Sequence, residues 1–324
     1  MFTENLESLR AARTSASLYE ACIDIMAHSP YVEYQKDNLG ALVDMVRETT
    51  VPDVSHEVRH PGPVDACFDI VFNSAMNGGY FYKAPETQGD DVIQWQINGS
   101  GSQAMYSWLD RLNQEGLIPS FGCHELTDEL RLRIDEHLCG VPYAVERRTI
   151  FEEFFDRDAQ YRFRQLMQNI VGEAFLLKSC NFSWDTVCAI ADIFPQSFKL
   201  DPFKKKACLS VLLLTCYLNR LGYQVQTDII IPSDYQIPRI LAFRGVLQLS
   251  DGFERALKSG RLLEPKCDAV MHFRAAAIVA CRDLAKLSNV PDWLVDQALF
   301  NTFRVNDDFR EKALPPMKIS GIWF

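Results

Sequence analysis

The sequence lacks the excess of basic side chains that binding a nucleic-acid polymer through bulk charge requires. Its 324 residues include 33 Lys and Arg against 43 Asp and Glu, which gives a formal net charge of −10. Proteins hold a phosphate backbone mainly through surplus Lys and Arg, so the composition excludes a domain of that kind. Any nucleotide contact must therefore be local, and we predict no nucleic-acid polymer as a partner.

Long hydrophobic runs are also missing. The longest apolar run, Val211 to Leu218, is far shorter than the roughly 20 residues that a helix needs to cross a membrane. The opening residues, MFTENLESLR, carry charged and polar groups and contain no apolar stretch of the kind found in secretory signals. These features predict a cytoplasmic protein without a membrane partner.

Sequence motifs for disulfides and metal ions are absent as well. None of the ten cysteines stands in a C-x-x-C pair, and several lie in apolar helical runs, which predicts reduced cysteines in the core. The six histidines show no ligand spacing, and His124-Glu125 is followed by Leu-Thr-Asp, so the H-E-x-x-H motif is not formed. We therefore predict neither a metal ion nor another cofactor.

No linker rich in Ser, Gly or Pro and no internal repeat divides the chain. Apolar residues at positions 126, 130, 134 and 138 form one stripe of a predicted helix. Thr127 is a suitable residue for the start of this helix. Similar periodicity covers residues 7–27, 38–48, 62–77, 102–115, 144–178, 183–193, 203–221, 237–248, 251–259, 269–287 and 291–303. Two short segments rich in β-formers predict a hairpin at about residues 80–97. The expected fold is mainly α, with a single helical domain over residues 1–324 and a small β-hairpin insertion.

One nucleotide-binding motif is present only in a loose form. Gly99, Gly101 and Ala104 satisfy G-x-G-x-x-A after a predicted strand, which is the pattern of a dinucleotide-binding turn. That turn requires a second parallel strand, whereas the residues that follow have helical periodicity. We interpret the motif as the exit of the hairpin into a helix.

Three consecutive lysines, Lys204, Lys205 and Lys206, stand where a strongly apolar helix is predicted to begin. Exposed lysines commonly form no more than a solvated face. Cationic side chains oppose the dipole at a helix N-terminus, however, at a cost on the order of a few tenths of a kcal/mol each. Their position is explained if an anion shares it, because a bound phosphate would use the free N–H groups and a lysine. Both interpretations stay open at this point.

The stretch from Ile229 to Leu241, IIIPSDYQIPRIL, is an apolar run that ends in a polar turn and enters a helix. Capping of that helix by Ser233 or Asp234 is one interpretation, and a cap contributes about 1 kcal/mol. Capping leaves the adjacent Tyr235 unexplained. A carboxylate between a buried run and a helix start is also what a pocket needs when positive charge develops on a bound sugar.

This region of the sequence resembles the queuosine salvage proteins, which are queuosine 5′-phosphate N-glycosylases related in fold to helical DNA glycosylases. The most specific likeness is Ser233 to Asp251, which is similar to the family's Ala-Asp-Tyr-Arg-Leu-Pro-Gln-x-Leu followed by Gly-x-Leu and Tyr-Ser. Weaker likenesses occur in the same order over nearly the whole chain: Ala75-Met-Asn77 with Tyr80-Phe81, Asn113 to Pro119, Val145 to Arg148, Phe194 to Ala207 and Ile322-Trp-Phe324.

The resemblance implies hydrolysis of the N-glycosidic bond of queuosine 5′-phosphate, with release of queuine for reuse in tRNA. It implies that Asp234 is the catalytic carboxylate, that Tyr235 is its neighbour in the pocket, and that Lys205 binds the 5′-phosphate. The partner is then a small-molecule nucleotide, queuosine 5′-phosphate or an analogue. The residues implied to contact or stack on the base are Asn77, Tyr80 and Phe81.

Several positions differ from the family's motifs. Ser102-Gln103-Ala104 stands where the family has Tyr-Trp-Ser, and Tyr80-Phe81 where it has Phe-Trp. These differences touch candidate base contacts and leave Asp234 and Lys205 in place, so they bear on the substrate more than on the reaction. A related 7-deazaguanine nucleotide or nucleoside stays an alternative substrate, and the phosphate-binding lysine is one of residues 204–206. A catalytically inactive nucleotide-binding protein or a helical interaction protein stays the alternative function.

Overall fold

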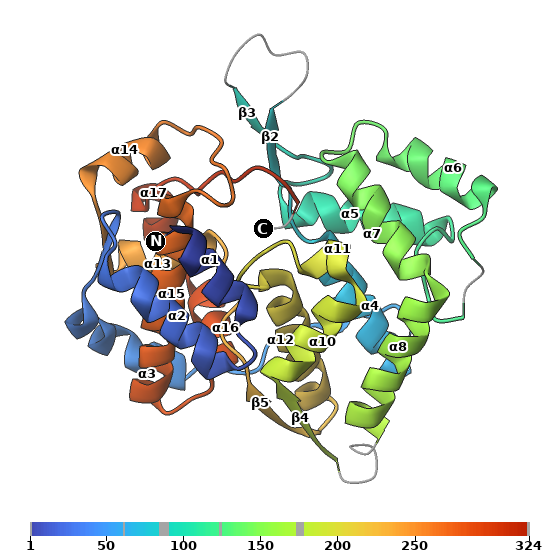
Figure 1. Ribbon diagram of the computed structural model, residues 1–324, viewed down its shortest axis with the longest axis horizontal. Coiled ribbons are helices and arrows are strands. Elements are labelled where there is room, and N and C mark those ends of the chain that lie inside the picture. Colours follow the sequence, from blue (N-terminus) through green and yellow to red (C-terminus); the bar gives the residue numbers. More distant parts are fainter. Residues whose placement is uncertain (1, 61, 84–90, 123–124, 173–177, 323–324) are drawn as a thin grey trace. The chain divides into compact units, whose positions relative to one another are not determined.

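The computed structural model describes the chain except residues 1, 61, 84–90, 123–124, 173–177 and 323–324. Helices make up most of the described residues (Figure 1). The strands among these residues pair only in two-stranded sheets. The mainly α fold predicted from the sequence is confirmed. Among the helices described, none is long and apolar enough to span a membrane.

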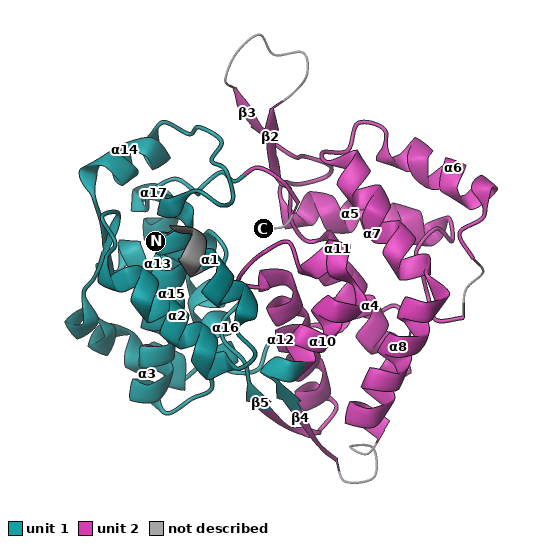
Figure 2. Cartoon of the chain, viewed as in Figure 1, with its two compact units in different colours: residues 1–52, 182–185, 227–319 teal, residues 53–181, 186–226, 320–324 magenta. Residues whose placement is uncertain are grey.

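The chain divides into two compact units, each assembled from separate stretches (Figure 2). Unit 1 comprises residues 1–52, 182–185 and 227–319, and unit 2 comprises residues 53–181, 186–226 and 320–324. Three passages of the chain from one unit to the other fall within β4 (Ser179–Ser183), α10 (Trp184–Ile193) and β5 (Gln224–Asp228). The single domain expected over residues 1–324 stays a prediction.

Unit 1 is built around α15 (Asp268–Ser288), which is buried along most of its length. Three consecutive alanines, Ala275 to Ala277, are completely buried there, and their small side chains let neighbouring helices approach closely. Helices α2 (Ser15–Ala27) and α16 (Asp292–Arg304) pack against it. The other elements of unit 1 are α1 (Phe2–Ala11), β1 (Val32–Tyr34), η1 (Lys36–Leu42), α3 (Val43–Arg47), α13 (Gln236–Phe243), β6 (Leu247–Leu249), α14 (Asp251–Lys258) and α17 (Asp307–Lys312).

Unit 2 is built around α4 (Pro63–Met76) and α12 (Lys205–Arg220), which pack on each other. Every residue of α4 from Ala66 to Met76 is buried. Strands β2 (Phe81–Lys83) and β3 (Val92–Gln94) pair antiparallel, so the predicted hairpin is confirmed. The other elements of unit 2 are η2 (Ser55–Glu57), α5 (Ser102–Gln114), α6 (Asp128–Leu138), α7 (Ala144–Phe155), α8 (Arg157–Met167), η3 (Gln168–Gly172) and α11 (Pro195–Phe198).

The beginning of α6 matches the sequence prediction, but two longer predicted helices are divided. Thr127 caps α6 by accepting a hydrogen bond from the Leu130 N–H. Residues 7–27 form two helices, because a capping box that begins at Thr14 starts α2 afresh. Residues 144–178 are interrupted at Asp156, whose carboxylate caps α8.

The short strands outside the hairpin have no counterpart among the predicted elements. Residues 237–248 begin as α13 and end in β6, which pairs antiparallel with β1. Strands β4 and β5 pair with each other. All four contain only three to five residues. Hydrophobic periodicity does not separate so short a strand from a helix end.

The cysteines follow the prediction made from their spacing. Nine cysteines lie among the described residues, none of these forms a disulfide with another, and seven of them are buried. They act as small apolar core residues. Cys123 lies outside the described residues.

Candidate functional site

The predicted site residues lie in both units. Asp234 and Tyr235 belong to unit 1, and Asn77, Tyr80, Phe81 and Lys205 belong to unit 2. Figure 2 shows the two units in different colours.

In unit 1, the loop that leads to Asp234 is fixed to α15 by two reciprocal hydrogen bonds. The Ser233 hydroxyl donates to the carbonyl oxygen of Arg274 (3.0 Å), and Nε of Arg274 donates to the carbonyl oxygen of Ser233 (2.8 Å). Both side chains are completely buried, so these bonds form away from competing water. The backbone immediately before Asp234 is therefore held by a rigid helix.

Tyr235 is the N-cap of α13, and the carboxylate of Asp234, one residue earlier, binds the first N–H of the helix with only one of its oxygens. Oδ1 accepts a hydrogen bond of 2.6 Å from the Gln236 N–H, the first in the helix. Ser233 does not cap, because its hydroxyl is bound to Arg274. Within the described part of the chain, Oδ2 of Asp234 has no hydrogen-bond partner. Capping and a second role for this carboxylate are thus compatible.

The neighbouring phenol is kept in its protonated form. Burial raises the pKa of Tyr235 above that of a free tyrosine, and the negative charge of Asp234 raises this pKa further. Tyr235 is consequently a hydrogen-bond donor beside the carboxylate over the whole physiological pH range. One residue further along, Oε1 of Gln236 is buried and has no partner among the described residues.

In unit 2, three of the predicted residues come together at the end of α4. Asn77 is the C-cap of this helix, and its Oδ1 accepts a hydrogen bond of 2.5 Å from the Tyr80 hydroxyl. The Phe81 carbonyl oxygen accepts from the Tyr143 hydroxyl (2.8 Å). Gly79, between Asn77 and Tyr80, has φ +68°, and a Cβ at this position would lie 2.8 Å from the Tyr143 ring. Only glycine fits this turn.

A buried arginine supports the same turn. Arg147 donates to the carbonyl oxygens of Met76 (3.0 Å), Gly78 (2.7 Å) and Pro142 (2.9 Å). Its guanidinium also lies 4.7 Å from the centre of the Trp95 ring. Burial lowers the pKa of Arg147 to about 10, so the group is still a cation at neutral pH. The loop that carries Asn77 is thus held by a fixed positive charge.

The three lysines are buried, which makes the interpretation as a solvated face wrong. Lys204, Lys205 and Lys206 are 8%, 5% and 2% exposed. Nζ of Lys206 donates to the carbonyl oxygen of Ala75 (2.5 Å), two residues before Asn77. Burial lowers the pKa of Lys206 strongly, and the charges of Lys205 and then Arg147 lower it further. Lys205, Lys206 and Arg147 therefore lie close to one another near the end of α4.

A buried carboxylate partly satisfies the beginning of α12. Oδ2 of Asp201 accepts from the Lys205 N–H (2.8 Å), and Oδ1 accepts from the Phe203 N–H (3.3 Å). The first N–H of α12 is therefore already used. A phosphate bound at this helix start stays a prediction.

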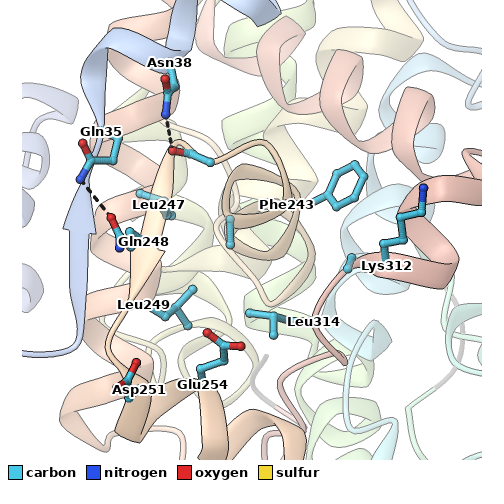
Figure 3. A pocket seen from close by; sticks show the side chains of 13 residues that line it. Gln35, Asn38, Phe243, Leu247, Gln248, Leu249, Asp251, Glu254, Lys312 and Leu314 are labelled. Carbon is cyan, nitrogen blue, oxygen red and sulfur yellow. Dashed lines mark hydrogen bonds between the residues drawn. The ribbon is translucent and has the colours of Figure 1, made fainter.

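A separate pocket of about 620 Å³ lies in unit 1 beside β6 (Figure 3). Its apolar lining includes Phe243, Leu247 and Leu314, and two carboxylates, Asp251 and Glu254, lie at one end. None of the predicted site residues lines it. Lys312 also lines it, with Nζ paired to Asp308 at 2.8 Å, so the pocket carries charges of both signs.

Sequence reasoning assigned no role to Arg147 and named Lys206 only as an alternative phosphate-binding lysine. Arg147 stands in the stretch Val145 to Arg148 that resembles a family motif, and Lys206 lies in the lysine run. The position of Lys206 next to a strongly apolar helical stretch was the sequence feature that could have indicated a buried lysine. Nothing in the sequence shows that both side chains donate to carbonyl oxygens at the end of α4.

Residues 217–324, one third of the chain, match the family model described as queuosine salvage protein. The chain resembles queuosine salvage proteins over this region. The match confirms the resemblance seen in the sequence and supports a role in queuosine salvage. It includes Asp234 and Tyr235 and does not extend to Asn77, Tyr80, Phe81 or Lys205. Among curated proteins, none matches the chain.

A metal centre finds no support in the described residues. No group of three or more His, Cys, Asp or Glu side chains among them is arranged to hold a metal ion. His124, the histidine next to Glu125, lies outside the described residues.

Proposed function

We propose that this protein hydrolyses the N-glycosidic bond of queuosine 5′-phosphate, or of a related 7-deazaguanine nucleotide, and so releases queuine. The single observation that carries the proposal is the position of Asp234. Its carboxylate lies inside the region that matches queuosine salvage proteins, on a loop fixed to a buried helix, with one oxygen unengaged among the described residues. A role in queuosine salvage and a fixed carboxylate together favour a glycosylase.

The chemistry follows from the charge that develops on the sugar. As the bond from C1′ to the base nitrogen breaks, its electron pair leaves with the base, and C1′ and the ring oxygen share a positive charge. A carboxylate beside that cation stabilises it, and the same group can orient a water and take its proton. The water oxygen bonds to C1′, and the leaving base gains a proton. Asp234 has this role in the proposal.

The remaining predicted residues would bind the phosphate and the base. Lys205 would bind the 5′-phosphate, with Lys206 and the cationic Arg147 close by. Asn77, Tyr80 and Phe81 would contact or stack on the base. What supports these roles is that Asn77 and Tyr80 are joined by a hydrogen bond and that buried cations hold their loop.

Mass spectrometry of released bases tests the proposal. The purified protein is incubated with a panel of 7-deazaguanine nucleosides and their 5′-phosphates, and the products are separated at set times. We expect free queuine from queuosine 5′-phosphate and slower release from unphosphorylated queuosine. Tight binding of queuosine 5′-phosphate with no base released over hours would contradict the glycosylase and favour a binding protein.

A further inference from the structure

α4 carries a stripe of polar side chains through the interior of unit 2. Asp69, Asn73 and Asn77 recur every four residues, so they share one side of the helix and its end. Asp69 is completely buried and Asn73 is 2% exposed. Buried polar groups are unfavourable unless they are paired, so each member of the stripe requires a partner.

At one end of the stripe this requirement is met within the protein. The Asp69 carboxylate accepts hydrogen bonds from the N–H groups of Arg59 (2.6 Å) and His60 (2.8 Å). Its Oδ1 also lies 2.9 Å from Nδ1 of His60. Asp69 therefore has a complete structural explanation, as an anchor for the chain segment that precedes α4.

In the middle of the stripe the requirement is not met. The Asn73 amide donates to the backbone oxygen of Glu57 (3.0 Å) and to its Oε2 (2.9 Å), and the Tyr106 hydroxyl donates to Oε1. Oδ1 of Asn73 and the hydroxyl of Ser74 nevertheless have no partner among the described residues. The same holds for Nε and Nη2 of Arg59. Such a concentration of buried unpaired atoms is unusual in a folded protein.

The unpaired atoms form a definite pattern of acceptors and donors. A carboxylate offers about four lone-pair positions, of which the Glu57 side chain uses two, and Asn73 Oδ1 adds two more. Next to these acceptors, Nε and Nη2 of Arg59 have no hydrogen-bond partner among the described residues. The Arg59 charge interacts first with Asp69, whose Oδ1 lies 3.6 Å from Nε, and then with Glu57. A complementary ligand therefore presents one acceptor followed by donors. A guanine-type base edge has this order: the 6-oxo group, the ring N–H and the 2-amino group.

The cluster lies close to the surface of unit 2 and to the predicted base contacts. His56, whose side chain is 63% exposed, covers Glu57 at 3.6 Å and meets the Tyr106 ring edge-on at 5.7 Å. Burial mainly raises the pKa of Tyr106, Glu57 raises it further, and Tyr80 adds to the rise. Tyr80 in turn donates to Asn77. The Tyr80 hydroxyl also lies 4.0 Å from Sδ of Met105, the residue before Tyr106, so the polar cluster is adjacent to the turn at the end of α4.

We propose that Glu57, Asn73 and Arg59 form a subsite that recognises the 2-amino-6-oxo edge of a nucleobase. Glu57 and Asn73 accept from the ring N–H and the 2-amino group, and Arg59 donates to the 6-oxo group. This inference rests on the proposed nucleotide substrate and adds the residues that select its base.

Two nucleotides that differ only in the 2-amino group test the subsite. Binding of 7-deazaguanosine 5′-monophosphate and of 7-deazainosine 5′-monophosphate to the full chain is measured by isothermal titration calorimetry. We expect 7-deazaguanosine 5′-monophosphate to bind at least about tenfold more tightly. Without the 2-amino group, the other nucleotide leaves buried acceptors unpaired. Glu57→Gln weakens binding of the first ligand only, so the two affinities come within about twofold of each other.

Glu153→Gln is the matched control. Glu153 is another hydrogen-bonded carboxylate of unit 2, which accepts from the N–H groups of Gln196 and Ser197 at the start of α11. This variant should discriminate between the ligands as the wild type does. Equal loss of both affinities in Glu57→Gln would show a purely structural role and overturn the proposal.

The affinities of the wild-type protein for the two nucleotides test the subsite even if Glu57→Gln does not fold. Equal affinities for the two nucleotides, or no binding of either, would overturn the subsite. Discrimination by a protein that releases no base would contradict the glycosylase and support the subsite. Base release by a protein that binds the two nucleotides equally would support the glycosylase and overturn the subsite.

Discussion

The ammonium group of Lys206 donates a hydrogen bond of 2.5 Å to the carbonyl oxygen of Ala75, inside unit 2. This bond joins the first turn of α12 to the last turn of α4, next to the loop that carries Asn77. Arg147 binds two further carbonyl oxygens of the same segment. Two buried basic side chains therefore fix the residues that we expect to contact the base.

The buried Lys206 side chain should make the stability of the protein depend on pH. Burial lowers the pKa of Lys206 well below its ordinary value of 10.5, so the unfolded chain binds more protons than the folded chain between the two values. The free energy of unfolding should consequently rise with pH in that window, by up to about 1.4 kcal/mol per pH unit. Lys206→Met should lack this contribution. Urea unfolding of both proteins between pH 7 and 9 measures it, and identical slopes would refute the assignment.

Arg147 and its neighbour Arg148 offer a matched pair of substitutions. Arg147→Lys should lower the free energy of unfolding by about 2–4 kcal/mol, because an ammonium cannot reproduce the planar set of bonds to three buried carbonyls. Arg148 forms a partly exposed ion pair with Asp135, so Arg148→Lys should cost less than about 1 kcal/mol. Chemical denaturation measures both. Similar losses in the two variants would contradict the structural role of Arg147.

The divided helix at residues 144–178 shows what the sequence predicted and what it left out. Its apolar periodicity continues through Asp156, so the pattern predicts one helix. The structure instead makes Asp156 the cap of α8, with its carboxylate 2.8 Å from the Ala159 N–H. Asp156 is an ordinary cap residue, but a cap is recognisable only once the preceding helix is known to end there. Helical content was therefore predictable, and this boundary was not.

Removing that cap should be measurable. Asp156→Ala should lower the free energy of unfolding by about 1 kcal/mol, because the Ala159 N–H loses its acceptor at a helix start. Asp158 lies in the same turn but forms only an exposed ion pair with Arg162, so Asp158→Ala should cost about 0.5 kcal/mol or less. Thermal melting of the two variants compares them. A larger effect of Asp158→Ala would be inconsistent with the cap.

The lysine run yields a prediction about phosphate recognition. If Lys205 binds the 5′-phosphate, Lys205→Met should reduce the preference for queuosine 5′-phosphate over queuosine by about tenfold or more, since a charge-assisted hydrogen bond is lost. Lys204→Met should keep the preference. Affinities of both ligands for the three proteins, measured by titration, decide the matter. A preference that vanishes in Lys204→Met and persists in Lys205→Met would reassign the phosphate to Lys204.

The candidate site was only partly predictable, for a physical reason. Asp234 and Tyr235 stand in one short motif, so a linear sequence shows them together. The partners that give them geometry are remote in sequence: Arg274 fixes the loop before Asp234, and Arg147 fixes the turn after Asn77. Such contacts join buried side chains to backbone carbonyls of distant segments. They leave no spacing that can be recognised in the sequence.

The central claim rests on the carboxylate of Asp234. Asp234→Asn removes its negative charge and keeps a side-chain oxygen able to accept from the Gln236 N–H, so the turn into α13 should be preserved. Asp307→Asn, at an exposed carboxylate within the same matched region, is the control. Melting curves of both variants should resemble that of the wild type.

Release of queuine from queuosine 5′-phosphate, followed by mass spectrometry in these three proteins, is the most direct test. The wild type and Asp307→Asn should release queuine at rates within about twofold of each other, and Asp234→Asn should be at least about a hundredfold slower. Release by Asp234→Asn at the wild-type rate would contradict the role of Asp234. Absence of queuine from the wild-type reaction would contradict the proposed function itself.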